Sequence, residues 1–307
     1  MSPGATLTAS LLDVLARPST WPVALLGFLV RGGWLVVVAP IVVVPTPVGL
    51  ANVIAPLLED AAFGRRTAEL VLVSVVALGA VVAVLLGGGL VAAVAEADGI
   101  RQVADEEHIG WHPGRVGFRI LAVRLAAHVP LAFASAYAAA RLIAVGYREL
   151  TVPSDVSAPL AWRILAGAPE AVALVLGTWL IGEILGALAA RRIVLQGDGA
   201  RAALTGAVRR LRQRPVRAIG FGLATTLVLA VVLAVTGLAA GATWGALGGA
   251  LSIGDASFTT TLLLVGFVAL FVGGLVLISL TSAWRAAVWT LDVGGTFGGV
   301  DGTRSGD

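Results

Sequence analysis

Three ionisable residues lie inside long apolar stretches of the chain: Arg31, His128 and Glu183. A charge at the centre of an inserted helix costs about 2.5–3.5 kcal/mol, so such residues tend to be paired or functional. At 1.5 Å per residue, all three lie about 12–15 Å deep from one side of the membrane. We predict that Arg31 pairs with Glu183 beside His128, either to fix helix register or as a proton relay or substrate contact. Arg124, one turn from His128, joins this candidate buried polar cluster but is shallow enough to snorkel to the interface.

A second group of titratable residues lies between positions 96 and 117, where His108 and His112 stand four residues apart beside several carboxylates. On a helix, that spacing could bind a divalent cation. Gly110 and Pro113 argue against a continuous helix, however, and no further ligand pair follows. We therefore predict a solvated loop, with no bound metal and no other cofactor.

The usual markers of catalysis are absent from the sequence. It contains no HExxH, G-x-S-x-G or G-x-x-x-x-G-K-[ST] motif. It also contains no cysteine, which excludes thiolate metal sites and cysteine nucleophiles. We therefore expect a protein that is not an enzyme.

Composition and hydropathy predict the elements that carry these residues. The 307-residue chain is 58% hydrophobic and 13% charged, with a mean hydropathy of +0.96, which is too apolar for a water-soluble domain. A bilayer core about 30 Å thick needs roughly 20 apolar residues per helix. Six stretches qualify, near residues 21–44, 70–95, 120–145, 165–190, 218–240 and 258–280. We predict an all-α, polytopic transmembrane helix bundle, with an N-terminal segment over 1–20, one transmembrane domain over 21–290 and a flexible cytoplasmic tail over 291–307.

Eight arginines between Arg191 and Arg217 form an arginine hinge, where the fourth stretch ends and the fifth begins. With Asp198 as N-cap and Pro215 as stop, the pattern predicts an amphipathic helix over 198–214. A basic residue beside anionic headgroups gains about 1 kcal/mol, which favours an interfacial helix at the cytoplasmic face. Alternatively, the arginines only set topology or bind a cytoplasmic partner. The candidate anionic-lipid contacts are Arg201, Arg209, Arg210, Arg212 and Arg214.

The arginines also orient the chain. Most of those outside the apolar stretches gather on the side of the arginine hinge, and the positive-inside rule then places both termini in the cytoplasm. All 21 basic residues are arginine, a bias typical of GC-rich bacterial genomes, so we expect a multi-pass protein of a bacterial cell membrane. The pI of 10.4 does not indicate nucleic-acid binding, because the net charge is only +3 and the basic residues lie beside apolar stretches.

The first apolar stretch is too long for a single helix. Residues 21–58 would reach about 57 Å as one helix, which exceeds the bilayer core. Pro40, Pro45 and Pro47 supply a break, because proline lacks an amide donor and clashes with the preceding turn. We expect residues 48–58 to form an interfacial helix, with a shallow re-entrant segment as the alternative.

Small residues recur at every fourth position in two of the apolar stretches. The fourth stretch carries Thr178, Gly182, Gly186 and Ala190, and the fifth carries Gly237, Gly241, Gly245 and Gly249. Such faces let two helix backbones approach closely. We therefore predict tight helix packing, either within the chain or with a membrane protein partner or a second copy.

Three segments resemble those of known membrane proteins: RRIVLQGDGARAALTGAVRRLRQRP from Arg191, FLVRGG around Arg31 and YRELTVPSD from Tyr147. They are similar to segments of bacterial six-helix integral membrane proteins of uncharacterised function. The first segment also resembles a junction in the membrane domain of glycerophosphodiester phosphodiesterases. The resemblance is architectural. It implies six spans with an amphipathic helix before the fifth, without the phosphodiesterase catalytic domain.

Two classes of function are open from the sequence. The abundance of packing glycine and the missing catalytic motifs favour a non-enzymatic scaffold or an accessory subunit of a membrane assembly. The alternative is a small-solute or lipid transporter that uses the buried Arg31, His128 and Glu183. We see no three-plus-three repeat of the kind that supports inverted symmetry in transporters.

Overall fold

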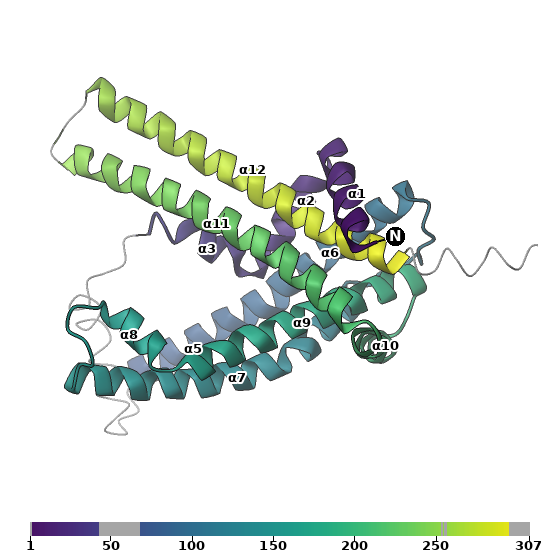
Figure 1. The fold of residues 1–307 in the computed structure, drawn as a ribbon, viewed down its shortest axis with the longest axis horizontal. Helices are drawn as coiled ribbons and strands as arrows, with labels where there is room; N and C mark the ends of the chain where they lie inside the picture. The colour runs from purple at the N-terminus through teal and green to yellow at the C-terminus, as the bar shows by residue number, and fades with distance from the viewer. Residues whose placement is uncertain (1, 43–67, 253, 255–256, 295–307) are drawn as a thin grey trace, which may run out of the picture. The chain divides into compact units, whose positions relative to one another are not determined.

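The computed structural model describes residues 2–42, 68–252, 254 and 257–294 (Figure 1). Within these ranges all regular structure is helical. Six of the described helical segments are long and apolar enough to cross a membrane, namely Thr20–Val38, Leu70–Glu106, Gly117–Thr151, Pro169–Gln196, Pro215–Ser252 and Phe258–Gly294. This confirms the prediction of an all-α, multi-pass membrane protein with six spanning helices.

Two predictions concern residues at or beyond the edges of these ranges. The predicted interfacial helix over 48–58 and residues 295–307 of the predicted tail lie outside the described residues. The last helix, α12 (Phe258–Gly294), continues through residues 291–294, so the predicted start of the flexible tail is wrong. The end of α12 is fixed by packing, since the side chain of Val293 is only 1% exposed.

The chain forms two compact units. Unit 1 consists of Met1–Ala16, Glu96–Leu227 and Trp284–Asp307, and unit 2 of Arg17–Ala95 and Val228–Ala283. Helices α6 (Gly89–Glu106), α11 (Pro215–Ser252) and α12 each contribute one end to each unit. The single transmembrane domain over 21–290 stays a prediction.

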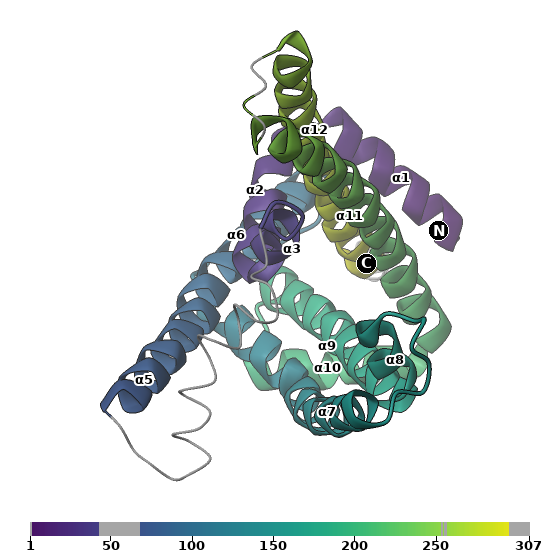
Figure 2. The same ribbon diagram turned by 90° about the vertical axis from the view of Figure 1, so that its left-hand side faces the viewer.

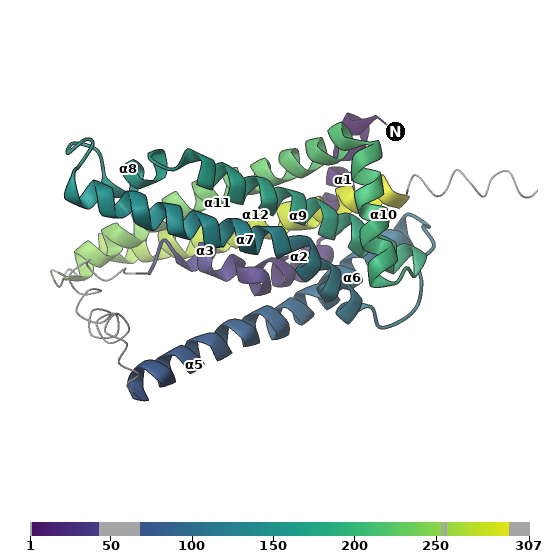
Figure 3. The same ribbon diagram turned by 90° about the horizontal axis from the view of Figure 1, so that it is seen from below.

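Unit 1 is built on two long helices, α7 (Gly117–Thr151) and α9 (Pro169–Gln196), which pack along one another (Figure 1, Figure 3). The short helix α8 (Leu160–Ala166) lies between them in the chain. Helix α9 begins with proline, where a missing amide donor costs nothing, and is capped by Gly197 with a φ of 72°. The close approach of α7 and α9 depends on Gly182, where a Cβ would lie 3.0 Å from the backbone oxygen of Ala127.

The arginine hinge contains helix α10 (Ala200–Gln213), which packs against α9 and α7. Its apolar face is turned toward these helices, since Ala203 and Ala207 are completely buried. The predicted N-cap is wrong, because Gly199 occupies that position. The Asp198 carboxylate instead lies 2.9 Å from Nε and 2.6 Å from Nη2 of Arg192, which neutralises this arginine at the end of α9.

Two helical segments of unit 1 extend beyond the sequence prediction. Helix α6 continues to Glu106, so the first half of the predicted loop over 96–117 is helical. The reason is an apolar face that includes Ile100 and Ala104, both buried. Helix α1 (Pro3–Ala16) lies in the predicted N-terminal segment, and its Leu7 carbonyl accepts a 3.1 Å hydrogen bond from the Trp284 indole.

The first span of unit 2 is broken in its middle. Helix α2 (Thr20–Phe28) passes into a π-helical turn, η1 (Leu29–Gly33), and α3 (Trp34–Val38) follows. Gly32 has a φ of 99°, which glycine adopts readily because it has no Cβ. The first break therefore comes earlier than the predicted break at Pro40.

The second span of unit 2 also contains a π-helical turn, but the helix is not broken there. Helix α5 (Ala68–Ala83) leads through the π-helical turn η2 (Val84–Gly88) into α6, and Figure 2 shows the three as one continuous rod. The turns η1 and η2 contact each other. A Cβ on Gly88 would lie 3.0 Å from the backbone oxygen of Val30, so glycine permits this contact.

The small-residue face of α11, formed by Gly237, Gly241, Gly245 and Gly249, packs against other described residues along only part of its length. A Cβ on Gly241 would lie 3.3 Å from Cβ of Pro40, and one on Gly237 would lie 3.5 Å from Cγ of the same proline. Gly245 and Gly249 would meet no described atom within 4 Å. This face therefore provides close packing only at Gly237 and Gly241.

Candidate functional site

A buried charge cluster lies in unit 1, where four helices meet. Helix α6 contributes a glutamate, α7 an arginine and a histidine, α9 a glutamate and an arginine, and α12 an arginine. Charges of both signs are thus brought together from segments far apart in the chain. The members of the cluster are Glu96, Arg124, His128, Glu183, Arg191 and Arg285.

The first half of the cluster is centred on Glu96, whose side chain is only 7% exposed. Arg124 binds it through two nitrogens, with Nη2 2.6 Å from Oε1 and Nε 3.1 Å from Oε2. Arg191, which is 2% exposed, donates from Nη1 to Oε1 at 2.9 Å. Two-nitrogen guanidinium pairing is among the strongest polar contacts in proteins, so Glu96 joins α6 firmly to α7 and α9.

The second half of the cluster is centred on Glu183. Its Oε2 accepts hydrogen bonds from Nη2 of Arg285 at 2.9 Å and from Nη1 of Arg124 at 3.4 Å. Its Oε1 lies 3.3 Å from Nε2 of His128. Arg124 therefore contacts both carboxylates, and the two halves form one network.

Two backbone oxygens also accept hydrogen bonds from Arg191. Its Nη1 also donates to the Ala187 carbonyl at 3.1 Å, and its Nη2 donates to the Ala286 carbonyl at 3.0 Å. A guanidinium has five N–H donors, and leaving them unsatisfied in an apolar environment is costly. The bond to Ala286 also ties α9 to α12.

The small residues of α9 make room for the cluster. A Cβ on Gly186 would lie 2.8 Å from Cδ of Arg124, and one on Gly182 would lie 3.0 Å from Cδ2 of His128. Gly182 and Gly186 thus leave room for the side chains of Arg124 and His128 as well as for the backbone of α7.

A second buried acidic residue, Asp292, joins the arginine hinge to α12. Its side chain is 5% exposed and lies 2.6 Å from Nε of Arg217 and 2.8 Å from Nη2 of Arg210. The same Arg210 nitrogen donates to the Asp292 backbone oxygen at 2.7 Å. Arg210 is thus turned toward this carboxylate, and its predicted contact with anionic lipid stays a prediction. The other predicted lipid contacts are exposed: Arg201, Arg209, Arg212 and Arg214.

The structure brings together three of the four residues of the predicted polar cluster: Arg124, His128 and Glu183. Arg124 does not snorkel, because its side chain is 13% exposed and bonded to Glu96. Arg31 belongs to unit 2, where it lies on η1 and is exposed. Its pairing with Glu183 stays a prediction.

Sequence reasoning missed three members of the cluster. The sequence predicts a loop at Glu96, and it indicates only membrane orientation for Arg191 of the arginine hinge and for Arg285. Their common feature is a position within five residues after the end of a predicted apolar stretch, on a helix that continues past that end. A carboxylate there, with arginines at comparable depth on other spans, is the signal that could have found them.

A separate group of polar contacts orders the connection between α7 and α8. The Glu149 carboxylate accepts hydrogen bonds from the amide and hydroxyl of Ser154, at 2.9 and 2.8 Å. The exposed Asp155 accepts similar bonds from Ser157, at 2.8 Å from the amide and 2.6 Å from the hydroxyl. The Ser157 donors lower the pKa of Asp155 below its ordinary value, because they stabilise its charged form. These are local turn contacts and require no ligand.

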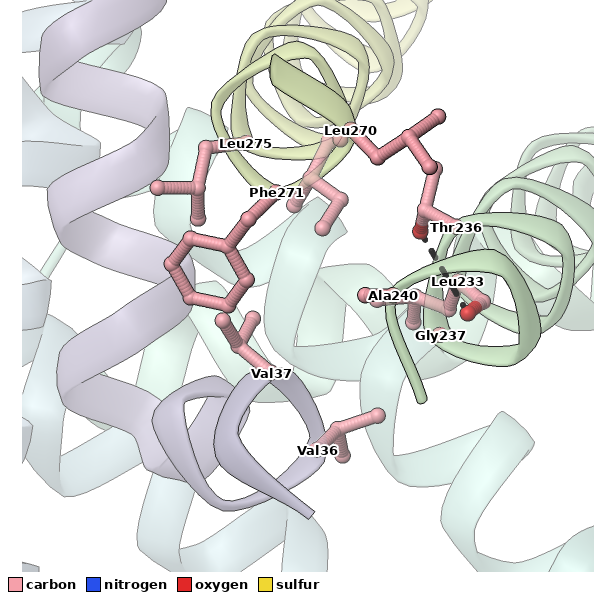
Figure 4. A pocket seen from close by; sticks show the side chains of 11 residues that line it. Val36, Val37, Leu233, Thr236, Gly237, Ala240, Leu270, Phe271 and Leu275 are labelled. Atoms are coloured by element: carbon pink, nitrogen blue, oxygen red, sulfur yellow. Dashed lines mark hydrogen bonds between the residues drawn. The ribbon is translucent and has the colours of Figure 1, made fainter. Parts of the chain in front are cut away.

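A pocket in unit 2 lies between α3, α11 and α12 (Figure 4). Among the described residues that line it, Thr236 carries the one polar side chain, and the rest are glycine or apolar residues such as Val37 and Phe271. The Thr236 hydroxyl donates to the Val232 carbonyl of its own helix at 2.7 Å. This lining offers no charge to recognise a polar solute, so the charge cluster of unit 1 is the better candidate site.

No protein family, curated protein or solved structure matches the chain. The cluster contains two carboxylates, three guanidiniums and one imidazole, bonded to one another and to backbone oxygens. Such an arrangement can hold helices in register, and its histidine can bind or release a proton.

Proposed function

We propose that the chain is a non-enzymatic component of a bacterial cell membrane, a scaffold or an accessory subunit of a membrane assembly. The supporting observation is the internal pairing of the charge cluster. Glu96 and Glu183 each contact at least two cationic side chains, so these charges bind helices to one another. The best-attested role of buried polar pairs is to fix register, as a scaffold requires.

We further propose that both termini and the arginine hinge lie in the cytoplasm. Helix α10 uses its apolar face against α7 and α9, which leaves four arginines exposed. Those side chains are available to anionic headgroups or to an acidic surface of a partner. The architectural likeness to bacterial six-helix membrane proteins belongs to the same proposal.

Co-purification from mild detergent tests the accessory-subunit role. The tagged full-length chain should retain a stoichiometric membrane partner. A variant with Arg201, Arg209, Arg212 and Arg214 all changed to Gln should lose it. If the unmodified chain is recovered alone from native membranes, or the Gln variant keeps the partner, the proposal of a partner held by these arginines fails.

A matched variant separates charge from misfolding. Changing the same four arginines to Lys keeps the positive charge and removes the planar guanidinium fork. The Lys variant should keep most of the partner if the contact is electrostatic. Accessibility of an introduced cysteine then shows whether either variant has changed its membrane orientation.

A small-solute or lipid transporter is the second candidate. The observation that favours it is the break of the first span at η1, which includes Arg31 and contacts the π-helical turn η2. Broken helices form substrate and ion sites in many transporters. Vesicles reconstituted with the chain should then show a pH-sensitive solute flux that is lost in Glu183→Gln. If no solute shows such a flux, the transporter candidate fails.

A further inference from the structure

Both ring nitrogens of His128 face oxygen atoms. Nδ1 lies 2.8 Å from the backbone oxygen of Arg124, and Nε2 lies 3.3 Å from Oε1 of Glu183. A backbone carbonyl can only accept, so Nδ1 must carry a hydrogen. A neutral imidazole has one N–H, which would leave Nε2 as a bare acceptor opposite a carboxylate oxygen.

Two acceptors facing each other repel, and one additional proton removes the conflict. It can lie on Nε2, as imidazolium, or on Oε1, as a protonated carboxyl group. Arg285 and Arg124 both donate to Oε2 of Glu183, which favours the ionised carboxylate. From these contacts we infer that His128 and Glu183 form a proton-binding site in unit 1, with the proton on His128.

The other charged groups of the cluster surround this site and come from four helices. Arg124 lies on the histidine's own helix, Arg191 on α9, Glu96 on α6 and Arg285 on α12. With His128 protonated, the cluster holds four cations and two carboxylates. The three arginines oppose protonation, so the carboxylate in contact with the ring is what retains the proton.

The site couples proton binding to helix packing. Gly182 holds the ring against α9, since a Cβ there would lie 3.2 Å from Nε2. When the proton leaves to solvent, the ring loses its donor toward Glu183, and one contact between α7 and α9 becomes unfavourable. The ligand of this site is thus a proton, and the element that responds is the α7–α9 pair. This inference rests on the contacts of the two side chains and is independent of the proposed function.

Nitrogen NMR of the histidine rings tests the inference directly, because the chain has only three histidines. The full-length His108→Gln, His112→Gln variant, labelled with ¹⁵N-histidine and studied in detergent at pH 7, contains His128 alone. We expect both of its ring nitrogens to be protonated. Adding Glu183→Gln should convert the ring to the neutral form with hydrogen on Nδ1.

The control is Glu170→Gln, which removes an exposed carboxylate from the same helix and should leave the spectrum unchanged. A bare Nε2 in the parent spectrum overturns the inference, even if the Glu183 variant does not fold. An unchanged doubly protonated ring in a folded Glu183→Gln variant also overturns it. Neither result depends on whether a partner co-purifies, so this test and that of the proposed function can fail separately.

Discussion

Arg191 of α9 donates from Nη1 to Oε1 of Glu96 of α6 at 2.9 Å, although 95 residues separate them in the chain. Both side chains are almost completely buried, at 2% and 7% exposed. Removing such charges from water costs several kcal/mol each, which only good geometry and further hydrogen bonds offset. The additional bonds from Arg124 to Glu96 and from Arg191 to two backbone carbonyls supply this compensation.

Glu96→Gln should strongly destabilise the folded chain. The change leaves two guanidiniums without their shared carboxylate, and breaking a buried pair in this way costs about 3–5 kcal/mol. The free energy of unfolding in mixed detergent micelles measures the effect. Glu170→Gln is the matched control, because its pair with Arg141 is 47% and 44% exposed and such pairs contribute about 0–1 kcal/mol. Equal losses in the two variants would contradict a buried role for Glu96.

Gly186→Ala should also lower stability, because the new Cβ would lie 2.8 Å from Cδ and 2.9 Å from Nη1 of Arg124. Overpacking of this kind typically costs about 1–3 kcal/mol. On the same helix, the Cβ of Gly177→Ala would meet no described atom within 4 Å, so we expect stability to change little or to rise slightly. Thermal denaturation of the two variants in one detergent makes the comparison. The packing of α7 on α9 would need revision if Gly177→Ala proved the more damaging change.

Arg210→Gln should destabilise the chain more than Arg209→Gln. Arg210 binds both the side chain and the backbone oxygen of Asp292, whereas Arg209 is exposed. A hydrogen bond to a buried charged group is worth about 1.5–3 kcal/mol, and exposed substitutions usually change stability by less than about 0.5 kcal/mol. The free energies of unfolding of the two variants show whether Arg210 contributes more to stability than Arg209. A larger loss for Arg209→Gln would contradict a structural role for the contact between Arg210 and Asp292.

Single cysteines introduced at positions 212 and 252 of this cysteine-free chain should lie on opposite sides of the membrane. Positions 212 and 252 are both exposed, so a thiol at either site is reachable by solvent reagents. In intact cells, Arg212→Cys should resist a membrane-impermeant thiol reagent and Ser252→Cys should react. Permeabilised cells, in which both should react, serve as the control. The reverse pattern in intact cells would invert the proposed orientation.

Hydropathy was sufficient to predict the six spanning helices, because about 20 apolar residues in a row leave few alternatives to a spanning helix. It could not predict how far each helix continues past its apolar stretch. Glu96 lies at the polar end of the second stretch, and only its packing partners on other helices show that α6 continues and that its side chain is buried.

Depth arguments found part of the cluster but not its remaining members. They placed His128 and Glu183 at one level, and the structure puts them in contact. Rotation of each helix about its axis, however, is set by tertiary packing, which a single sequence does not reveal. For this reason Arg124, expected to reach the interface, instead links Glu96 to Glu183.

A double-mutant cycle on Glu96 and Arg191 measures whether the buried charge cluster holds α6 and α9 together. Glu96→Gln, Arg191→Met and the double variant are compared by their free energies of unfolding in mixed micelles. We predict that the double variant is more stable than the sum of the single losses implies, by about 1–3 kcal/mol, as for residues in direct contact. Losses that add to within about 0.5 kcal/mol would contradict this role of the cluster, because independent sites behave in that way.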